Sequence, residues 1–346
     1  MNIEKYTETI KACRFCFMCR HLSPIGNVTF READTPRVRA ILLDRVLRDP
    51  AELANEDLLD TLYSSELSAA CRYHCVNHYD ENGLVLAARE DAVTAGLAPA
   101  DVRQIAEEYL ARPAAPTISG KGDVLYFIDS CTAAVPEIAA AFGKIMKKAG
   151  VSYRIAENGC LGKVLKVLGY TKEAKKAAGE FAAAINAAGV KTVVVSNPAA
   201  YDALVHDFPE MGIKLKGKVM HTSEYLLSLK LTCKKKAGAL YYLESDFLKN
   251  YHTDYKFPAA LLSHLGAKRL QFGTNNEESY TCGEGALVLP QLRPALVERL
   301  AGYIEARADH IEKDLLVTAS PYTRKQLTTH TKLKVVTLEE LTASLL

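Results

Sequence analysis

The sequence predicts a mixed fold, in which an all-helical N-terminal region is followed by two pseudo-symmetric α/β repeats. Three observations lead to this prediction. Helix caps and helical periodicity recur through residues 1–112, and no strand signal precedes Val124. After Val124, short apolar runs typical of buried parallel strands alternate with helical segments. A second copy of this alternation begins near residue 237.

The N-terminal region contains recognisable helix starts. Thr35 followed by Pro36 provides an N-cap and a first helical residue. Asn55 provides the cap of a second helix, and two further helices are expected at Leu84–Ala95 and Ala100–Ala111. The apolar faces of the first two helices consist of Val38, Ile41, Leu42 and Val46, and of Leu58, Leu59 and Leu62.

A change of composition separates this region from the rest of the chain. The segment Arg112–Gly122 is rich in Pro and Gly and is interpreted as a linker. The elements expected after it are a strand at Val124–Ile128, helices at Pro136–Ala149 and Lys172–Ala188, and a strand at Lys191–Ser196.

An internal repeat defines the expected domains. Gly122–Cys131 aligns with Ala237–Asp246 at an offset of 115 residues, and Thr222–Leu226 aligns with Thr337–Leu341 at the same offset. We therefore expect a helical domain at residues 1–118 and two Rossmann-like α/β repeats at 119–236 and 237–346.

Composition narrows the class of protein. The chain has 346 residues, 49% of them hydrophobic, and a formal net charge of +2. Such a composition supports folded cores, and the balanced charge argues against a nucleic-acid-binding face. No apolar run approaches the roughly 18 residues of a membrane span, and residues 1–15 lack a secretory signal. We expect a cytoplasmic protein. The alternative is peripheral attachment to the inner face of a membrane through other members of a complex.

Three closely spaced cysteines are the strongest chemical signal. Cys13, Cys16 and Cys19 have the C-x2-C-x2-C spacing of bacterial ferredoxins, in which a fourth cysteine precedes a proline and serves a second cluster. Here Ser23 occupies that fourth position, before Pro24. Cluster iron takes soft thiolate ligands, for which a serine oxygen is a poor substitute. The spacing therefore predicts three ligands of one iron–sulfur cluster.

A second cysteine segment supplies the remaining ligand. Cys71 and Cys75 have the C-x3-C spacing of such a motif, but Ser65 and Ser68 replace its first two cysteines. One cluster requires Cys13, Cys16, Cys19 and Cys75, which are all present; the other would require Ser23, Ser65, Ser68 and Cys71. We therefore predict one [4Fe–4S] cluster on the complete set and an unligated Cys71.

A structural zinc site is the alternative for the same residues. Zinc binds sets of four cysteines, or of three cysteines and a histidine, and His21, His74 and His78 lie near the cysteines in sequence. Zinc motifs usually contain two separate pairs of closely spaced cysteines, whereas the C-x2-C-x2-C triplet is an iron–sulfur spacing. The sequence therefore favours iron.

The chain resembles a known family over essentially its whole length. Pro24, the segment Glu32–Arg37 and the segment Leu67–Pro99 are similar to the iron–sulfur subunits of glycolate oxidase and anaerobic glycerol-3-phosphate dehydrogenase. The α/β repeats resemble the cysteine-rich CCG domains of those subunits and of heterodisulfide reductase. The resemblance implies a ferredoxin-like N-terminal domain and two degenerate CCG domains.

The repeats depart from the family pattern. Cys131 and Cys160 match family ligands in the first repeat, and Cys282 alone remains in the second. The other family ligand positions hold Leu161, Asn197 and Ala200 in the first repeat. In the second repeat they hold Asp246, Thr281, Ser320 and Thr323. Neither repeat supplies the five thiolates of the family's non-cubane clusters. We expect the three cysteines to be buried remnants; the alternative is a shared crevice at the strand ends.

The resemblance implies an electron-transfer subunit of a multi-subunit flavin-dependent dehydrogenase. A partner subunit would hold FAD and oxidise a 2-hydroxy acid or a similar small substrate. Single electrons would pass through the cluster to a quinone, a ferredoxin or an electron-transfer flavoprotein. The alternative is a scaffold subunit whose cluster or zinc site is structural.

Catalytic side chains are not expected on this chain. Tyr201, Asp202 and His206 lie at helical spacing after Pro198, and we interpret His206 as a surface residue. No Ser/His/Asp set or paired carboxylates are recognisable in the sequence.

Overall fold

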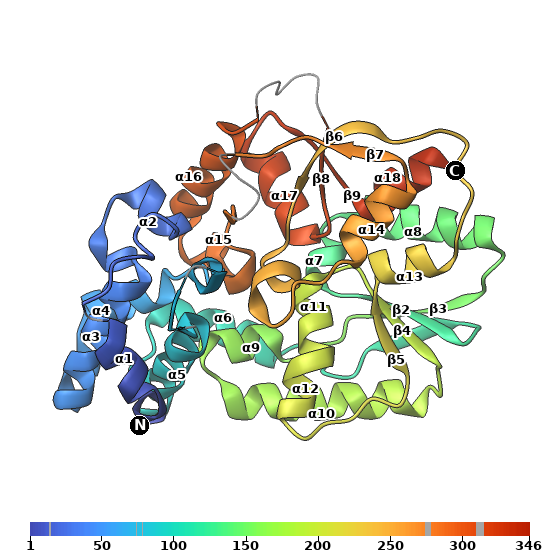
Figure 1. Ribbon diagram of the computed structural model, residues 1–346. Coiled ribbons are helices and arrows are strands. Elements are labelled where there is room, and N and C mark those ends of the chain that lie inside the picture. The colour runs from blue at the N-terminus through green and yellow to red at the C-terminus, as the bar shows by residue number, and fades with distance from the viewer. Residues whose placement is uncertain (14, 74, 78, 274–277, 309–314) are drawn as a thin grey trace.

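The computed structural model describes residues 1–13, 15–73, 75–77, 79–273, 278–308 and 315–346 (Figure 1). It contains helices together with a five-stranded sheet and a four-stranded sheet, both rich in parallel pairs. The predicted mixed fold class is therefore confirmed. No helix in the described ranges is both long enough and apolar enough to span a bilayer.

Helices form every regular element that is described up to Leu110. Two predicted caps are confirmed: the Thr35 side chain accepts a hydrogen bond from the Val38 N–H, and the Asn55 side chain accepts from Leu58. The helices are η1 (Asn2–Tyr6), α1 (Thr7–Cys13), α2 (Pro24–Thr29), η2 (Glu32–Asp34), α3 (Pro36–Arg48), η3 (Pro50–Ala54), α4 (Glu56–Tyr63), η4 (Ala70–Tyr73), α5 (Glu81–Thr94) and α6 (Ala100–Leu110).

The first sheet has the strand order β1-β3-β2-β4-β5. Its strands are β1 (Thr117–Gly120), β2 (Val124–Ile128), β3 (Tyr153–Glu157), β4 (Thr192–Val195) and β5 (Lys218–His221). All neighbouring pairs are parallel except β1 with β3. The expectation that residues 112–122 are only a linker was wrong, because β1 forms an antiparallel edge there. The expected boundary between residues 118 and 119 falls inside this strand.

The second sheet repeats the topology of the first. Its order is β7-β6-β8-β9, and every pair is parallel. Its strands are β6 (Gly238–Leu243), β7 (Ala267–Arg269), β8 (Leu315–Thr318) and β9 (Lys334–Thr337). The order matches β3-β2-β4-β5 strand for strand, as the internal sequence repeat predicts. The division into three domains stays a prediction.

Helices connect the strands of both sheets. Those of the first repeat are α7 (Ser130–Ala133), α8 (Pro136–Ala149), α9 (Lys163–Leu168), α10 (Thr171–Ala187), α11 (Pro198–Asp202), the π-helix η5 (Ala203–Asp207), α12 (Phe208–Glu210) and α13 (Thr222–Ser228). Those of the second are the π-helix η6 (Phe247–Tyr251), α14 (Phe257–His264), η7 (Glu284–Ala286), α15 (Leu289–Leu292), α16 (Pro294–Glu305), α17 (Pro321–His330) and α18 (Leu338–Leu345).

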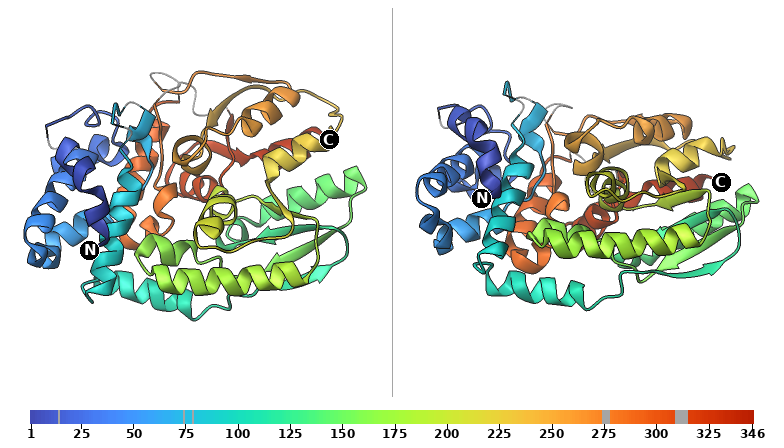
Figure 2. Two further views of the ribbon diagram at one scale, coloured as in Figure 1. Left: turned by 60° about the horizontal axis from the view of Figure 1, so that its bottom comes forward. Right: turned by 90° about the horizontal axis from the view of Figure 1, so that it is seen from below.

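The three parts of the chain pack closely. Phe142, Val194 and Leu338 belong to one apolar core that includes side chains from both sheets. The N-terminal helices gather at one end of the molecule (Figure 2). There the buried Arg89 donates hydrogen bonds to the carbonyls of Leu62 and Val167, which joins the helical part to α9.

Contacts with the second repeat fix the second cysteine segment. The side chains of Asn250 and Tyr251 donate hydrogen bonds to the carbonyls of Ser68 and Leu67. A Cβ at Gly285 would lie 2.0 Å from the Leu67 carbonyl oxygen, so this approach requires glycine.

Candidate functional site

The first cysteine segment is a loop between α1 and α2. Cys13 is the last residue of α1, and its carbonyl accepts a hydrogen bond from the Cys16 N–H at 3.2 Å. The Cys19 carbonyl accepts from the Leu22 N–H at 3.1 Å. The Ser23 side chain then caps α2 by accepting from the Gly26 N–H. Successive turns therefore bring three cysteines to one side of the loop.

The second cysteine segment begins in η4 and lies beside the first cysteine segment. The Cys71 carbonyl accepts a hydrogen bond from the Cys75 N–H at 3.1 Å. The Tyr79 N–H donates to the Cys75 sulfur at 3.4 Å. Asp80 then caps α5, because its carboxylate accepts from the Gly83 N–H.

All four predicted ligands line one cavity of about 410 Å³, its open mouth included. Cys71, which the sequence analysis treats as unligated, lines the same cavity. Its thiol donates a hydrogen bond to the Glu81 carboxylate at 3.6 Å. The remaining lining residues are Met18, Leu22, Arg37, Val76, Asn77 and Tyr79. The structure thus brings together residues that lie up to 62 positions apart in sequence.

Burial and mutual proximity disfavour thiolates at this site. Burial, followed by the charges of Cys75, Cys19 and Cys16, raises the pKa of Cys13 to about 12. Burial also raises the pKa of Cys19 to about 11, although a backbone hydrogen bond from Arg37 counteracts part of that effect. Several thiolates so close together require cations between them.

Four cysteines are a usual donor set both for an iron–sulfur cubane and for a structural zinc ion. Thiolates that share one zinc ion at about 2.3 Å would lie roughly 4 Å apart. Among the described residues, no three of these sulfur atoms fall within 4.8 Å of one another. His21 does not line the cavity, and His74 and His78 lie outside the described residues.

A buried ionic network lies at the serine-substituted ligand set. Arg39 is 1% exposed and pairs with the carboxylates of Glu81 and Glu66. Ser68 donates a hydrogen bond to Glu66. Ser23 and Arg39 both donate to the Asp34 carbonyl, and Cys71 contacts Glu81. Charged side chains therefore contact Ser68 and Cys71, two of the four positions that the sequence analysis assigns to a second ligand set.

The cysteines of the α/β repeats occupy two separate places. Cys131 and Cys160 line one cavity at the carboxyl ends of β2 and β4, together with Arg112 and Asn197. Cys282 is fully buried in the apolar core of the second repeat and does not line that cavity. Two of the three cysteines therefore share a crevice, and the third is packed as a core residue.

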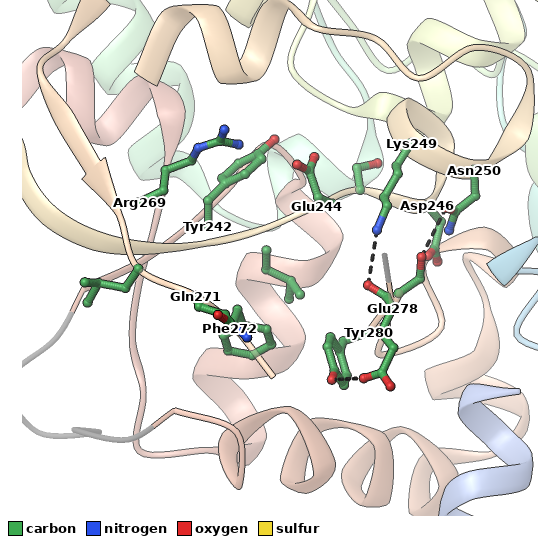
Figure 3. Close-up of a pocket in the computed structure, with 14 residues that line it drawn as sticks. Tyr242, Glu244, Asp246, Lys249, Asn250, Arg269, Gln271, Phe272, Glu278 and Tyr280 are labelled. Carbon is green, nitrogen blue, oxygen red and sulfur yellow. Dashed lines mark hydrogen bonds between the residues drawn. The ribbon is translucent and has the colours of Figure 1, made fainter. Parts of the chain in front are cut away.

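A cavity of the second repeat was not recognised in the sequence. A cavity of about 1180 Å³, its mouth included, lies at the carboxyl ends of β6 and β7 (Figure 3). Asp246 stands where the family pattern has a cysteine, and it accepts a hydrogen bond from Thr281 at 2.6 Å. Lys249 and Arg269 also line the cavity. Ligand sites at strand carboxyl ends are typical of α/β sheets, which was the available signal.

The interpretation of His206 as a surface residue was incomplete. Its ring is half-buried and stacks on His252, with centroids 3.8 Å apart. The partner residue lies in the other repeat, so no spacing rule could join the two.

The comparisons show a partial relative and a similar fold. No family model matches the chain. It is 29% identical to an EtfAB:quinone oxidoreductase of Syntrophomonas wolfei, over 43% of this chain and 21% of that protein. The chain therefore spans about a fifth of the length of that relative. A crystal structure of a hypothetical protein from Helicobacter pylori covers 99% of this chain and 76% of its own, with a TM-score of 0.63 and 12% identity.

Proposed function

We propose that this chain is an electron-transfer subunit that holds one [4Fe–4S] cluster on Cys13, Cys16, Cys19 and Cys75. The convergence of these thiols on one cavity is the observation that carries the proposal. The named electron-transfer relative supports a general redox role. When bound, such a cluster accepts and releases single electrons.

The surrounding residues have defined tasks in this proposal. Backbone N–H groups of Arg37 and Tyr79 point to the sulfurs of Cys19 and Cys75 and stabilise negative charge there. Such hydrogen bonds raise the reduction potential of a cluster. The apolar side chains of Met18, Leu22 and Val76 limit the access of water. No substrate chemistry is assigned to this chain.

Exposed apolar side chains around the cavity form the proposed partner-docking face. Phe15, Phe17, Met18 and Val76 are 80%, 73%, 50% and 76% exposed. Large apolar side chains at this exposure are typical of interaction sites. Because they come from both cysteine segments, a partner that covers them would lie directly over the thiols. Electron transfer would then occur across a short distance.

The family resemblance suggests the partners. A flavin-containing dehydrogenase subunit would oxidise a 2-hydroxy acid or a similar small substrate, with FAD held on that subunit. The acceptor would be a quinone, a ferredoxin or an electron-transfer flavoprotein; a quinone is favoured by the name of the relative.

Replacement of one ligand tests the relay. The complex is isolated anaerobically with its copurifying flavoprotein, and iron, acid-labile sulfide and electron flow to an artificial acceptor are measured. Cys16→Ser should abolish electron flow while the complex still assembles. Full turnover in an intact complex without iron would overturn the proposal.

The docking face is tested by a second pair of variants. Phe17→Ser should slow electron transfer from the reduced flavoprotein about tenfold without loss of iron. Leu110→Ser is the matched control, because Leu110 is 47% exposed at the end of α6 and outside the face. Equal rates in both variants would place the docking face elsewhere.

A scaffold with a structural cluster or zinc site is the second candidate. The contacts of Asn250 and Tyr251 with the second cysteine segment favour it, because a metal group there would also join the helical part to the second repeat. In that case Cys16→Ser should cause dissociation of the complex rather than selective loss of electron flow.

A further inference from the structure

Asp202, His206 and His252 form a cluster of metal-ligating side chains far from the cysteines in sequence. One donor atom from each lies within 4.8 Å of the other two. Asp202 ends α11, His206 belongs to the π-helix η5, and His252 directly follows the π-helix η6. Short π-helical turns are uncommon and are frequent at functional sites. One such turn, η5, contains His206, and the other, η6, ends directly before His252.

The Asp202 carboxylate presents one oxygen to Lys163 and the other to His252. Its side chain is 3% exposed, and Oδ2 accepts a hydrogen bond from Lys163 at 2.5 Å. Oδ1 is buried and receives no well-directed hydrogen bond; the Nε2 atom of His252 lies 3.3 Å away. A cation at this position would give this buried carboxylate oxygen a stronger partner than its long contact with His252.

The surrounding charges permit a cation. Lys163 also pairs with Asp207 at 2.7 Å, and Lys166 pairs with Asp207 and Glu210. Three carboxylates thus face two ammonium groups, which leaves a net negative charge beside the histidines. A cation is therefore not repelled by the site as a whole.

The exposed His252 ring must turn to coordinate one ion together with His206, because the two rings are stacked with their planes 19° apart. The Nε2 atom of His206 is 2.8 Å from the Tyr255 hydroxyl, which fixes the orientation of the ring. His252 is the exposed member, and both His252 and Asp202 line a cavity of about 1340 Å³, its mouth included. An ion bound by these residues would have coordination positions on the cavity side that remain accessible.

We propose that Asp202, His206 and His252 bind a divalent transition metal of the zinc class, with at least one position open to the cavity. Two imidazoles and one carboxylate are a usual donor set for such ions, and three protein ligands with an open position are typical of reactive zinc sites. The ion would also join the chain after β4 to the chain after β6. This site is independent of the cysteines and of the proposed electron transfer.

Cobalt(II) tests the proposal, because its visible absorption reports its ligands. Anaerobically isolated protein is titrated with Co²⁺, and the spectrum and affinity are compared among variants. His252→Ala and Asp202→Asn should each weaken Co²⁺ binding by more than about a hundredfold, since loss of a ligand exceeds the roughly 10–100-fold effect typical of outer-shell changes. His330→Ala, at the end of α17, is the control and should bind as the parent does.

Each outcome decides the question. Loss of the same absorption band in both ligand variants, with the control unchanged, supports the site. Unchanged binding in both ligand variants overturns it, as does a parent spectrum that contains only thiolate-to-cobalt bands. His252 is exposed, so its replacement leaves the fold intact and keeps the comparison valid if Asp202→Asn unfolds.

Discussion

The two ligand sets of the N-terminal region differ in how their charge is balanced. In the complete set, one buried and three partly buried cysteines line one cavity, and burial and proximity raise the pKa of Cys13. In the substituted set, the Arg39 guanidinium lies between Glu66 and Glu81 and is almost fully buried. Thiolates in the first set would need cations from outside the chain to balance their charge, whereas the second set contains the Arg39 cation.

This difference indicates how one site of a two-cluster pattern can be replaced. Exchange of cysteine for serine alone would leave a polar void, which is costly in a protein interior. Here serines bond to the backbone and to Glu66, and Arg39 with its carboxylates supplies volume and charge. A buried ion pair stabilises little by itself, but removal of one member leaves an unpaired buried charge.

The largest expected contrast is between two cysteines of the same segment. Cys75→Ala should abolish incorporation of the cluster, because it removes one of four thiolates. Cys71→Ala should retain the full iron content, since its thiol bonds to Glu81. Iron and sulfide analysis of both variants checks this. Equal loss of iron from the two would show that Cys71 is a ligand.

The Arg39 network should be the next most sensitive position. Arg39→Met should lower the free energy of unfolding by about 3–5 kcal/mol, because Glu66 and Glu81 lose their buried counter-charge. Arg45→Met on the same helix is the control; its pair with Glu52 is exposed, and its loss should cost less than about 1 kcal/mol. Urea denaturation measures both. A cost equal to that of the control would contradict a central role for Arg39.

Stability should also depend on the protonation of Glu66. Burial raises its pKa to about 7, with Arg39 opposing and Glu81 adding to the shift. The folded state therefore binds more protons than the unfolded state between about pH 4.5 and pH 7, and stability falls as pH rises through this window. Glu66→Gln should reduce the fall by about 3 kcal/mol. The exposed Glu52→Gln serves as control, and an unchanged pH profile of Tm in Glu66→Gln would contradict the assignment.

Local signals made much of the fold predictable. The caps at Thr35 and Asn55 identified their helices because side-chain oxygens bond to backbone groups a few residues away. Strand β1 was missed because its pairing with β3, which lies more than 30 residues later, overrides a Pro- and Gly-rich composition.

The candidate site was predictable only where donors recur at short spacing. The cysteine spacing identified four residues that the structure brings together. The role of Arg39 was hidden, because an arginine on an amphipathic helix looks like a solvated residue. Similarly, His206 and His252 meet only through the packing of two repeats.

The smallest effect is expected when cysteines are restored to the substituted ligand set. This experiment is the most specific test of the difference between the two ligand sets. Ser23→Cys, Ser65→Cys and Ser68→Cys together would restore four cysteines to the substituted set, with Cys71 as the fourth. The iron content should nevertheless not increase, because the Arg39 cation and its carboxylates occupy the space that a cluster needs. Addition of Arg39→Ala and Glu66→Ala to the triple variant should open that space and permit a second cluster. Iron analysis and the electron paramagnetic resonance of the reduced protein distinguish one cluster from two. A doubled iron content in the triple variant alone would show that the serines, and not the ionic network, exclude the second cluster.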